Sequence, residues 1–150
     1  AGARVWSIPD GKPVAHLLRH ETVIQTQALG AGRLLLRTSA GARVFLTDTW
    51  LEDRALELAP PVNSLTCSRD GRLLAVQADN EIRVLRASDL TEIHRLSPPA
   101  HAGWLGEGHL VFSADAGHLM IHSAVGTVIR WDLRSLDEEL ESLGMKNGRP

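Results

Sequence analysis

The sequence predicts an all-β protein: a partial β-propeller of about three four-stranded antiparallel blades, followed by a short C-terminal α-helix. One observation is a recurring phrase whose large apolar residue falls at Trp6, Phe45, Leu85 and Trp131, at intervals of 39, 40 and 46 residues. A second is a turn glycine before each leucine-rich run, which recurs with the same spacing. A period near 40 residues with several short strands per unit is typical of propellers.

Each unit divides into short apolar runs separated by turn residues, as expected for strands. The repeat units are expected at about 1–19, 20–58, 59–96 and 97–134. The expected strands are 3–8, 14–19, 23–29, 34–38, 43–47, 54–58, 62–68, 73–77, 81–86, 91–96, 109–113, 119–123 and 127–133, with an insertion at about 102–107.

The second strand of a unit is apolar at consecutive positions, as at 34–36 and 119–121. A strand with one face in solvent would alternate apolar and polar residues, so these strands are expected to be covered on both faces. Blades that pack face to face satisfy this requirement. A two-sheet antiparallel sandwich is the alternative, but a sandwich gives no reason for a repeat of about 40 residues.

A helix is expected at 136–143, with residues 135–150 forming a C-terminal helix and a frayed tail. Ser135 and Glu138 have the spacing of a capping box, and acidic residues follow in the first turn. Leu136, Leu140 and Leu143 share one helical face, which is expected to cover the flank of the last blade. Gly144 is placed to end the helix.

The strand count is too small for a closed ring, because propellers use roughly 4–8 blades. Two explanations are open. The chain is the C-terminal section of a longer protein, which also explains a first residue other than methionine, or several copies assemble into one ring. We favour the first. The exposed blade edges also predict self-association.

The totals for the 150-residue chain exclude several classes of protein. A net charge of −2 and a pI of about 6.4 argue against a dedicated nucleic-acid binder. No apolar run reaches the roughly 20 residues needed to span a bilayer, and no signal-peptide pattern opens the chain. Cys67 has no cysteine to pair with in this chain, which gives weak support for a cytoplasmic location.

Several motifs resemble those of the WD-repeat (WD40) family. Trp131-Asp132, preceded by 126–128, is similar to the end of a WD repeat. Residues 68–75 and 112–115 resemble the turn between the first two strands of such a repeat. His20 and His101 precede first strands, where the family often has Gly-His. The resemblance covers about 130 residues. It implies a propeller that binds proteins or peptides on one face of the ring, and no catalysis.

The match departs from the family at its buried hydrogen-bond tetrad. The last blade has His101, Ser123 and Trp131, but Val125 stands where the family has an acid. His101, Ser123, Trp131 and Asp132 are therefore expected to be structural residues in blades that depend mainly on apolar packing. The strand that leads into a short acidic helix is similar to the tails of large bacterial multi-repeat proteins, some of which carry a protein kinase domain.

No catalytic, cofactor or metal residues are predicted. His118 and His122 would share one strand face about 13 Å apart, too far for one ion. Cys67 has no neighbouring base in the sequence to activate it. Trp50 and Trp104 are the candidate partner contacts, and local packing is the alternative for both.

The predicted function is a non-catalytic protein-interaction scaffold, part of a WD-repeat β-propeller. The partner is expected to be a protein or peptide, with neither nucleic acid nor a membrane involved. The alternative is a sensor or regulatory appendage of a larger enzyme, such as a bacterial protein kinase. An enzyme that uses a propeller channel is the third hypothesis, with His101, His109, His118 and His122 as its candidates.

Overall fold

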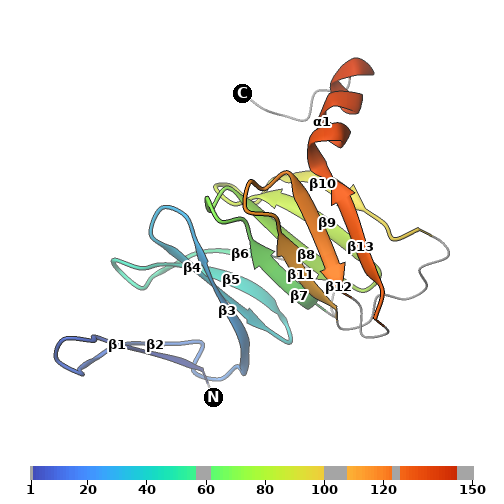
Figure 1. Cartoon of the computed structure of the whole chain (residues 1–150). Helices are drawn as coiled ribbons and strands as arrows, with labels where there is room; N and C mark the ends of the chain where they lie inside the picture. Colours follow the sequence, from blue (N-terminus) through green and yellow to red (C-terminus); the bar gives the residue numbers. More distant parts are fainter. Residues whose placement is uncertain (1, 57–61, 100–107, 123–125, 145–150) are drawn as a thin grey trace. The chain divides into compact units, whose positions relative to one another are not determined.

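A computed structural model describes residues 2–56, 62–99, 108–122 and 126–144 (Figure 1). The chain divides into two units, Ala1–Pro61 and Val62–Pro150. The described residues form four antiparallel sheets and one short C-terminal helix, so the all-β class and the terminal helix are confirmed. None of the described helical segments is long and apolar enough to cross a membrane.

The first unit contains a two-stranded and a four-stranded sheet. The strands are β1 (Ala3–Trp6), β2 (Pro13–Leu17), β3 (Val23–Leu29), β4 (Arg33–Thr38), β5 (Gly41–Leu46) and β6 (Glu52–Leu56). β1 pairs with β2, and β3 to β6 pair in chain order. Leu17, Leu36 and Phe45 form a buried cluster that joins the two sheets, and Val5 and Ala15 pack against it.

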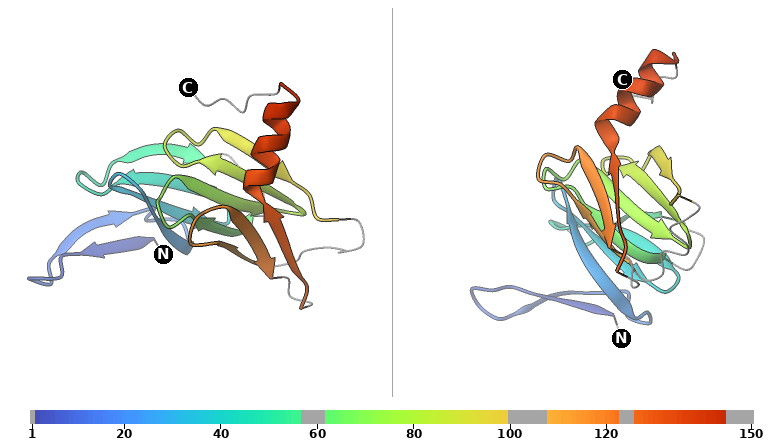
Figure 2. Two further views of the ribbon diagram at one scale, coloured as in Figure 1. Left: turned by 45° about the horizontal axis from the view of Figure 1, so that its top comes forward. Right: turned by 45° about the vertical axis from the view of Figure 1, so that its right-hand side comes forward.

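The second unit contains a four-stranded and a three-stranded sheet, followed by the helix (Figure 2). Its elements are β7 (Val62–Cys67), β8 (Leu73–Ala78), β9 (Glu81–Arg86), β10 (Glu92–Leu96), β11 (His109–Phe112), β12 (His118–His122), β13 (Val128–Asp132) and α1 (Leu133–Ser142). The buried side chains of this unit's largest cluster are Ala75, Ile82, Val84, Leu96, Leu110, Phe112, Leu119, Ile121 and Leu133.

The residues that set the sequence period occupy one register position. Phe45 lies opposite Leu34, Leu85 opposite Leu74, and Trp131 opposite Leu119. The second strands of the larger sheets, β4 and β8, bury consecutive apolar residues, as their sequences predict. The same prediction for residues 119–121 is wrong in part, because Leu119 and Ile121 are buried and Met120 between them is half-buried. The expected strands are all present, and no bound differs from its expected position by more than two residues.

Two turns of the second unit share one set of hydrogen bonds. Ser68 Oγ–H donates to Asp70 Oδ1 at 2.6 Å, and the Leu73 N–H donates to Ser68 Oγ at 2.9 Å. Ser113 Oγ–H donates to Asp115 Oδ1 at 2.6 Å, and the His118 N–H donates to Ser113 Oγ at 2.9 Å. The serine and aspartate therefore hold the turn between the first two strands in the same way in both sheets.

The predicted start of the helix is wrong. The helix begins at Leu133, not Leu136, and its N-cap is Asp132, whose Oδ1 accepts hydrogen bonds from the N–H groups of Arg134 and Ser135 at 3.1 Å each. The first turn contains no acidic residue. An aspartate can close a strand and cap the next helix, so the chain passes from β13 into α1 without the expected capping box at Ser135.

The end of the helix is predicted correctly, and its apolar face only in part. Gly144 follows the last turn with a φ of +73°, and its N–H donates to the Glu141 carbonyl at 3.0 Å. Leu136 packs against the core of the second unit, but Leu143 is 63% exposed. The helix extends beyond the end of β13 (Figure 2), and Leu143 follows its last residue as an exposed side chain. The expected insertion at 102–107 and the tail at 146–150 lie outside the described residues.

Candidate functional site

The expected structural set of the last repeat is described in part. Trp131 is half-buried and packs against the core of the second unit. Asp132 is exposed, and the backbone hydrogen bond from Ser135 holds the pKa of its carboxyl below the ordinary value. Asp132 Oδ2 lies 3.7 Å from His118 Nε2. His101 and Ser123 lie outside the described residues, so their predicted role is not tested.

Of the two tryptophans predicted as partner contacts, only Trp50 lies among the described residues. Trp50 is half-buried against the core of the first unit, and its backbone is left-handed with a φ of +58°. These two features favour local packing for Trp50. Trp104 lies outside the described residues, so its role stays a prediction.

The side chains considered for catalysis or metal binding stay dispersed. Across the part of the chain that the structure describes, no three His, Cys, Asp or Glu residues converge to hold a metal ion. His109 faces His122 across the β11–β12 pair. Cys67 is half-buried, and burial, followed by the charge of Asp70, raises the pKa of its thiol. A raised pKa keeps the thiol protonated and therefore poorly nucleophilic.

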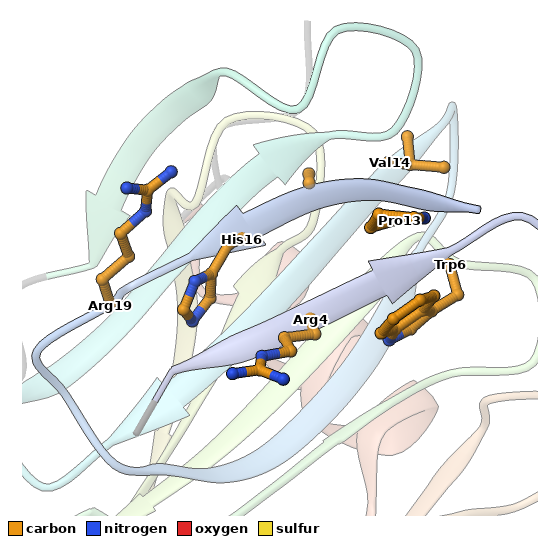
Figure 3. Close-up of a pocket in the computed structure, with 7 residues that line it drawn as sticks. Arg4, Trp6, Pro13, Val14, His16 and Arg19 are labelled. Atoms are coloured by element: carbon orange, nitrogen blue, oxygen red, sulfur yellow. The ribbon is translucent and has the colours of Figure 1, made fainter.

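An open pocket of about 370 Å³ lies on one face of the β1–β2 sheet (Figure 3). The residues that line this pocket, called here the β1–β2 pocket, are Arg4, Trp6, Pro13, Val14, Ala15, His16 and Arg19. Arg4 lies opposite His16 in the register, and Trp6 lies opposite Pro13. The strand pair therefore places a cationic end and an aromatic end side by side on one face.

The β1–β2 pocket is solvent-exposed because the other face of its sheet forms the core. Val5 alternates with Arg4 and Trp6 along β1 and packs on the buried cluster of the first unit, and Ala15 contacts the same cluster at the edge of the pocket. Trp6 is 53% exposed and Val14 50% exposed. Trp6 therefore lies exposed beside Arg4 on this sheet.

The β1–β2 pocket is electrostatically one-sided. It is lined by two arginines and a histidine, and none of its lining residues is acidic. Among the described residues, no ion pair involves Arg4 or Arg19. The guanidinium groups of these two residues are therefore available to an anionic group.

Equivalent arginines elsewhere in the chain hold carboxylates. Arg43 stands two residues before Phe45, as Arg4 does before Trp6, and it contacts Glu21 at 2.7 Å and Glu52 at 3.6 Å. Arg83, two residues before Leu85, pairs with Glu92. Glu52 and Glu92 are the first residues of β6 and β10, opposite Phe45 and Leu85. At the same place β2 begins with Pro13, so Arg4 lacks the carboxylate that its equivalents have.

Sequence reasoning missed this pocket because Trp6 served only as an anchor of the repeat period. A signal was present in the sequence. Seven positions after Phe45 and Leu85 stand Glu52 and Glu92, whereas seven positions after Trp6 stands Pro13. The change from glutamate to proline in one repeat marks an arginine without its internal partner.

A second groove, of about 430 Å³, lies in the second unit between β10 and α1. Its lining residues are Ile93, His94, Arg95, Leu96, Leu136, Glu139, Leu140 and Leu143. His94 Nε2 lies 3.2 Å from Asp137 Oδ1 and joins the strand to the helix. Arg95 in this groove already contacts Glu92 and Glu81, in contrast to the arginines of the β1–β2 pocket.

Comparison with known proteins gives no relative: no family model matches the chain, and no curated protein matches it. The function must therefore be argued from the geometry of the chain itself.

Proposed function

We propose that this chain is a non-catalytic protein-interaction scaffold built from WD-type propeller repeats. The single observation that carries the scaffold role is the β1–β2 pocket, where Trp6 and Arg4 stand exposed on the sheet and Arg19, two residues after β2, joins the lining. Tryptophan and arginine are the residues most enriched among those that dominate binding energy at protein interfaces. The partner is a protein or peptide.

The repeat identity is supported by recurrence at three levels. The large apolar residue occupies the same register position in three sheets. The serine–aspartate turn has the same hydrogen bonds at Ser68 and at Ser113. The strands of each sheet pair in chain order, as strands within a propeller blade do. A ring of such repeats would need further sheets beyond the four described.

Selection from a random peptide library displayed on phage tests the scaffold role. We expect peptides selected on the purified chain to bind it in fluorescence anisotropy titrations, and to lose at least tenfold in affinity when Trp6→Ser removes the aromatic surface. Ile24→Ser is the matched control, because Ile24 is 52% exposed in the same unit and does not line the pocket.

Two outcomes would overturn the proposal. The first is a library that yields no binding peptide. The second is a set of peptides whose affinity falls equally with Ile24→Ser and Trp6→Ser. No observation among the described residues favours the alternative, a regulatory appendage of a larger enzyme, so that alternative stays a prediction.

A further inference from the structure

We propose that the β1–β2 pocket recognises an acidic segment of a partner protein, with carboxylates bound to Arg4 and Arg19 and an apolar side chain placed over Trp6. This inference rests on the proposed scaffold function and adds the chemistry of the partner. The occupant is a stretch of polypeptide in which aspartate or glutamate alternates with bulky apolar residues.

The first argument is the internal comparison of equivalent arginines. Arg43 is held by Glu21 and Glu52, and Arg83 by Glu92. This position of the repeat therefore binds carboxylates wherever the chain supplies them. At Arg4 the internal carboxylate is replaced by Pro13, which offers no charge. A partner that supplies a carboxylate would give Arg4 the environment that its two equivalents already have.

The second argument is the chemistry of the guanidinium group. Arginine presents planar, paired donors that match a carboxylate with two parallel hydrogen bonds. Arg4 and Arg19 both line the β1–β2 pocket, with His16 beside Arg4 (Figure 3). A segment with more than one acidic side chain can engage both arginines, and it meets no carboxylate of the pocket that would repel it.

The third argument is the uncovered apolar surface. Phe45 and Leu85, the equivalents of Trp6, are 5% and 0% exposed, whereas Trp6 is 53% exposed. Pro13 and Val14 extend this surface along β2. An apolar side chain of the partner would remove it from water, which favours binding by roughly 25 cal/mol for each Å² of apolar surface buried. A purely polar acidic segment would leave this surface exposed.

A sheet of a second copy of the chain is a poorer occupant. The open strand β13 carries exposed Arg130, and the neighbouring strands carry exposed His109 and His122. Asp132, the one carboxylate of this three-stranded sheet, already caps α1 through the N–H groups of Arg134 and Ser135, so the sheet offers Arg4 and Arg19 mainly cationic groups. The acidic helix α1 of a second copy has suitable charge, and the experiment below separates it from a foreign segment.

Designed peptides test the proposal on the full chain. The probe is a rhodamine-labelled eight-residue peptide of alternating glutamate and leucine, with glutamine–leucine and lysine–leucine peptides as matched controls. We expect the glutamate peptide to bind at least tenfold more tightly than the glutamine peptide, with an affinity that falls as salt is raised, and the lysine peptide not to bind.

Variants locate the binding. Arg4→Gln and Arg19→Gln should each weaken the glutamate peptide about tenfold, because each removes a charge-assisted hydrogen bond. Arg130→Gln removes an exposed strand arginine outside the pocket and should change nothing. Pro13→Glu should weaken the peptide several-fold, because its carboxylate competes for Arg4. All four positions are exposed, so unchanged melting temperatures are expected to confirm that the variants fold.

The outcomes separate the inference from the function on which it rests. One outcome is equal affinity for the glutamate and glutamine peptides, with library peptides that still need Trp6 to bind. This would overturn the proposal of an acidic partner and leave the proposed scaffold function standing. No binding by designed or selected peptides would overturn both. A third outcome is that the chain associates with itself in analytical ultracentrifugation, in a concentration-dependent way that the double substitution Glu138→Gln and Glu139→Gln abolishes. That result would overturn the foreign segment and identify α1 of a second copy as the occupant.

Discussion

The strand pairs β1–β2 and β5–β6 share one pairing register but differ in how far their large apolar residue is exposed to solvent. Each is antiparallel with an irregularity at the same place, beside Trp6 in one pair and beside Phe45 in the other. Phe45 is 5% exposed and packs with Leu17 and Leu36, whereas Trp6 is 53% exposed. Arg43 has two carboxylate partners, and Arg4 has none among the described residues.

The difference shows that strand pairing and surface chemistry are decided separately. The register follows from local sequence and is the same in both pairs. What the large apolar residue and its arginine do depends on whether a sheet packs over them and on one residue across the strand. The same repeat position therefore stabilises the core in one place and is available for binding in another.

The largest expected effect is the difference in stability loss between truncation of Phe45 and truncation of Trp6. Phe45→Ala removes a buried side chain and leaves a cavity, and it should lower the free energy of unfolding by about 3–5 kcal/mol. Trp6→Ala removes a half-exposed side chain and should lower it by less than about 1 kcal/mol. Urea denaturation followed by far-UV circular dichroism measures both.

The contrast fails if both substitutions destabilise the first unit equally. That result would mean that the indole of Trp6 is buried in solution, and the β1–β2 pocket would then not exist as an open surface. Because the chain has two units, the transition must be assigned to the first unit by hydrogen exchange of β4 and β5 amides.

Much of the fold was predictable because turn residues and short apolar runs, which are local features of the sequence, define the repeat. Glycine turns and apolar runs gave every strand, and the interval between Phe45 and Leu85 matched a common register. The start of α1 was missed because Asp132 and Ser135 are both good N-cap residues, and the choice depends on where β13 ends. No sequence pattern decides between two adjacent caps of similar strength.

The candidate site was largely beyond prediction. Exposure of Trp6 is a property of what covers its sheet, because Phe45 and Leu85 stand in similar motifs and are buried. For Trp50 the sequence leaves partner contact and local packing open, because only the folded chain brings it against the cluster of Leu17, Leu36 and Phe45. The replacement of glutamate by Pro13 could have been noticed, but its meaning depends on the ion pairs that Arg43 and Arg83 form.

A smaller effect is expected at the two serine–aspartate turns, whose fourth residues differ. Gly71 has a φ of +71°, and Ala116 has a φ of +56° at the equivalent position. Left-handed backbone disfavours a Cβ atom, so Gly71→Ala should destabilise the second unit by about 1 kcal/mol. Ala116→Gly should be neutral or slightly stabilising, because relief of strain opposes the greater entropy of glycine in the unfolded chain. Thermal denaturation compares the two variants, and equal shifts of the same sign would contradict the shared geometry.

The same turns predict a pH dependence. The hydrogen bond from Ser113, then that from the Gly117 N–H and the charge of Arg134, lower the pKa of Asp115 from 3.8 to about 2. A lowered pKa in the folded state stabilises the protein above pH 4, and this contribution is lost as the pH falls from about 4 to about 2. Ser113→Ala should therefore reduce stability at pH 7 and flatten the profile in that window. Urea midpoints between pH 7 and pH 2.5 measure it, and parallel profiles for both proteins would contradict the role of Ser113.

The smallest expected effect comes from making β1–β2 resemble β5–β6. Pro13→Glu places a carboxylate opposite Trp6, where Glu52 stands opposite Phe45. A surface ion pair contributes about 0.2–1 kcal/mol, and loss of proline destabilises by a similar amount, so the net change in stability should be close to zero. A double-mutant cycle with Arg4→Gln isolates the pair, and we expect a coupling of about 0.5 kcal/mol.

The corresponding cycle of Arg43→Gln with Glu52→Gln provides the reference for that coupling. A measurable coupling at Arg43 with none at Arg4 would mean that the guanidinium of Arg4 does not lie over residue 13, although the two strand pairs share one register. In that case the arginine would have to be oriented by another group, and the argument from equivalent positions would no longer identify a carboxylate as its missing partner.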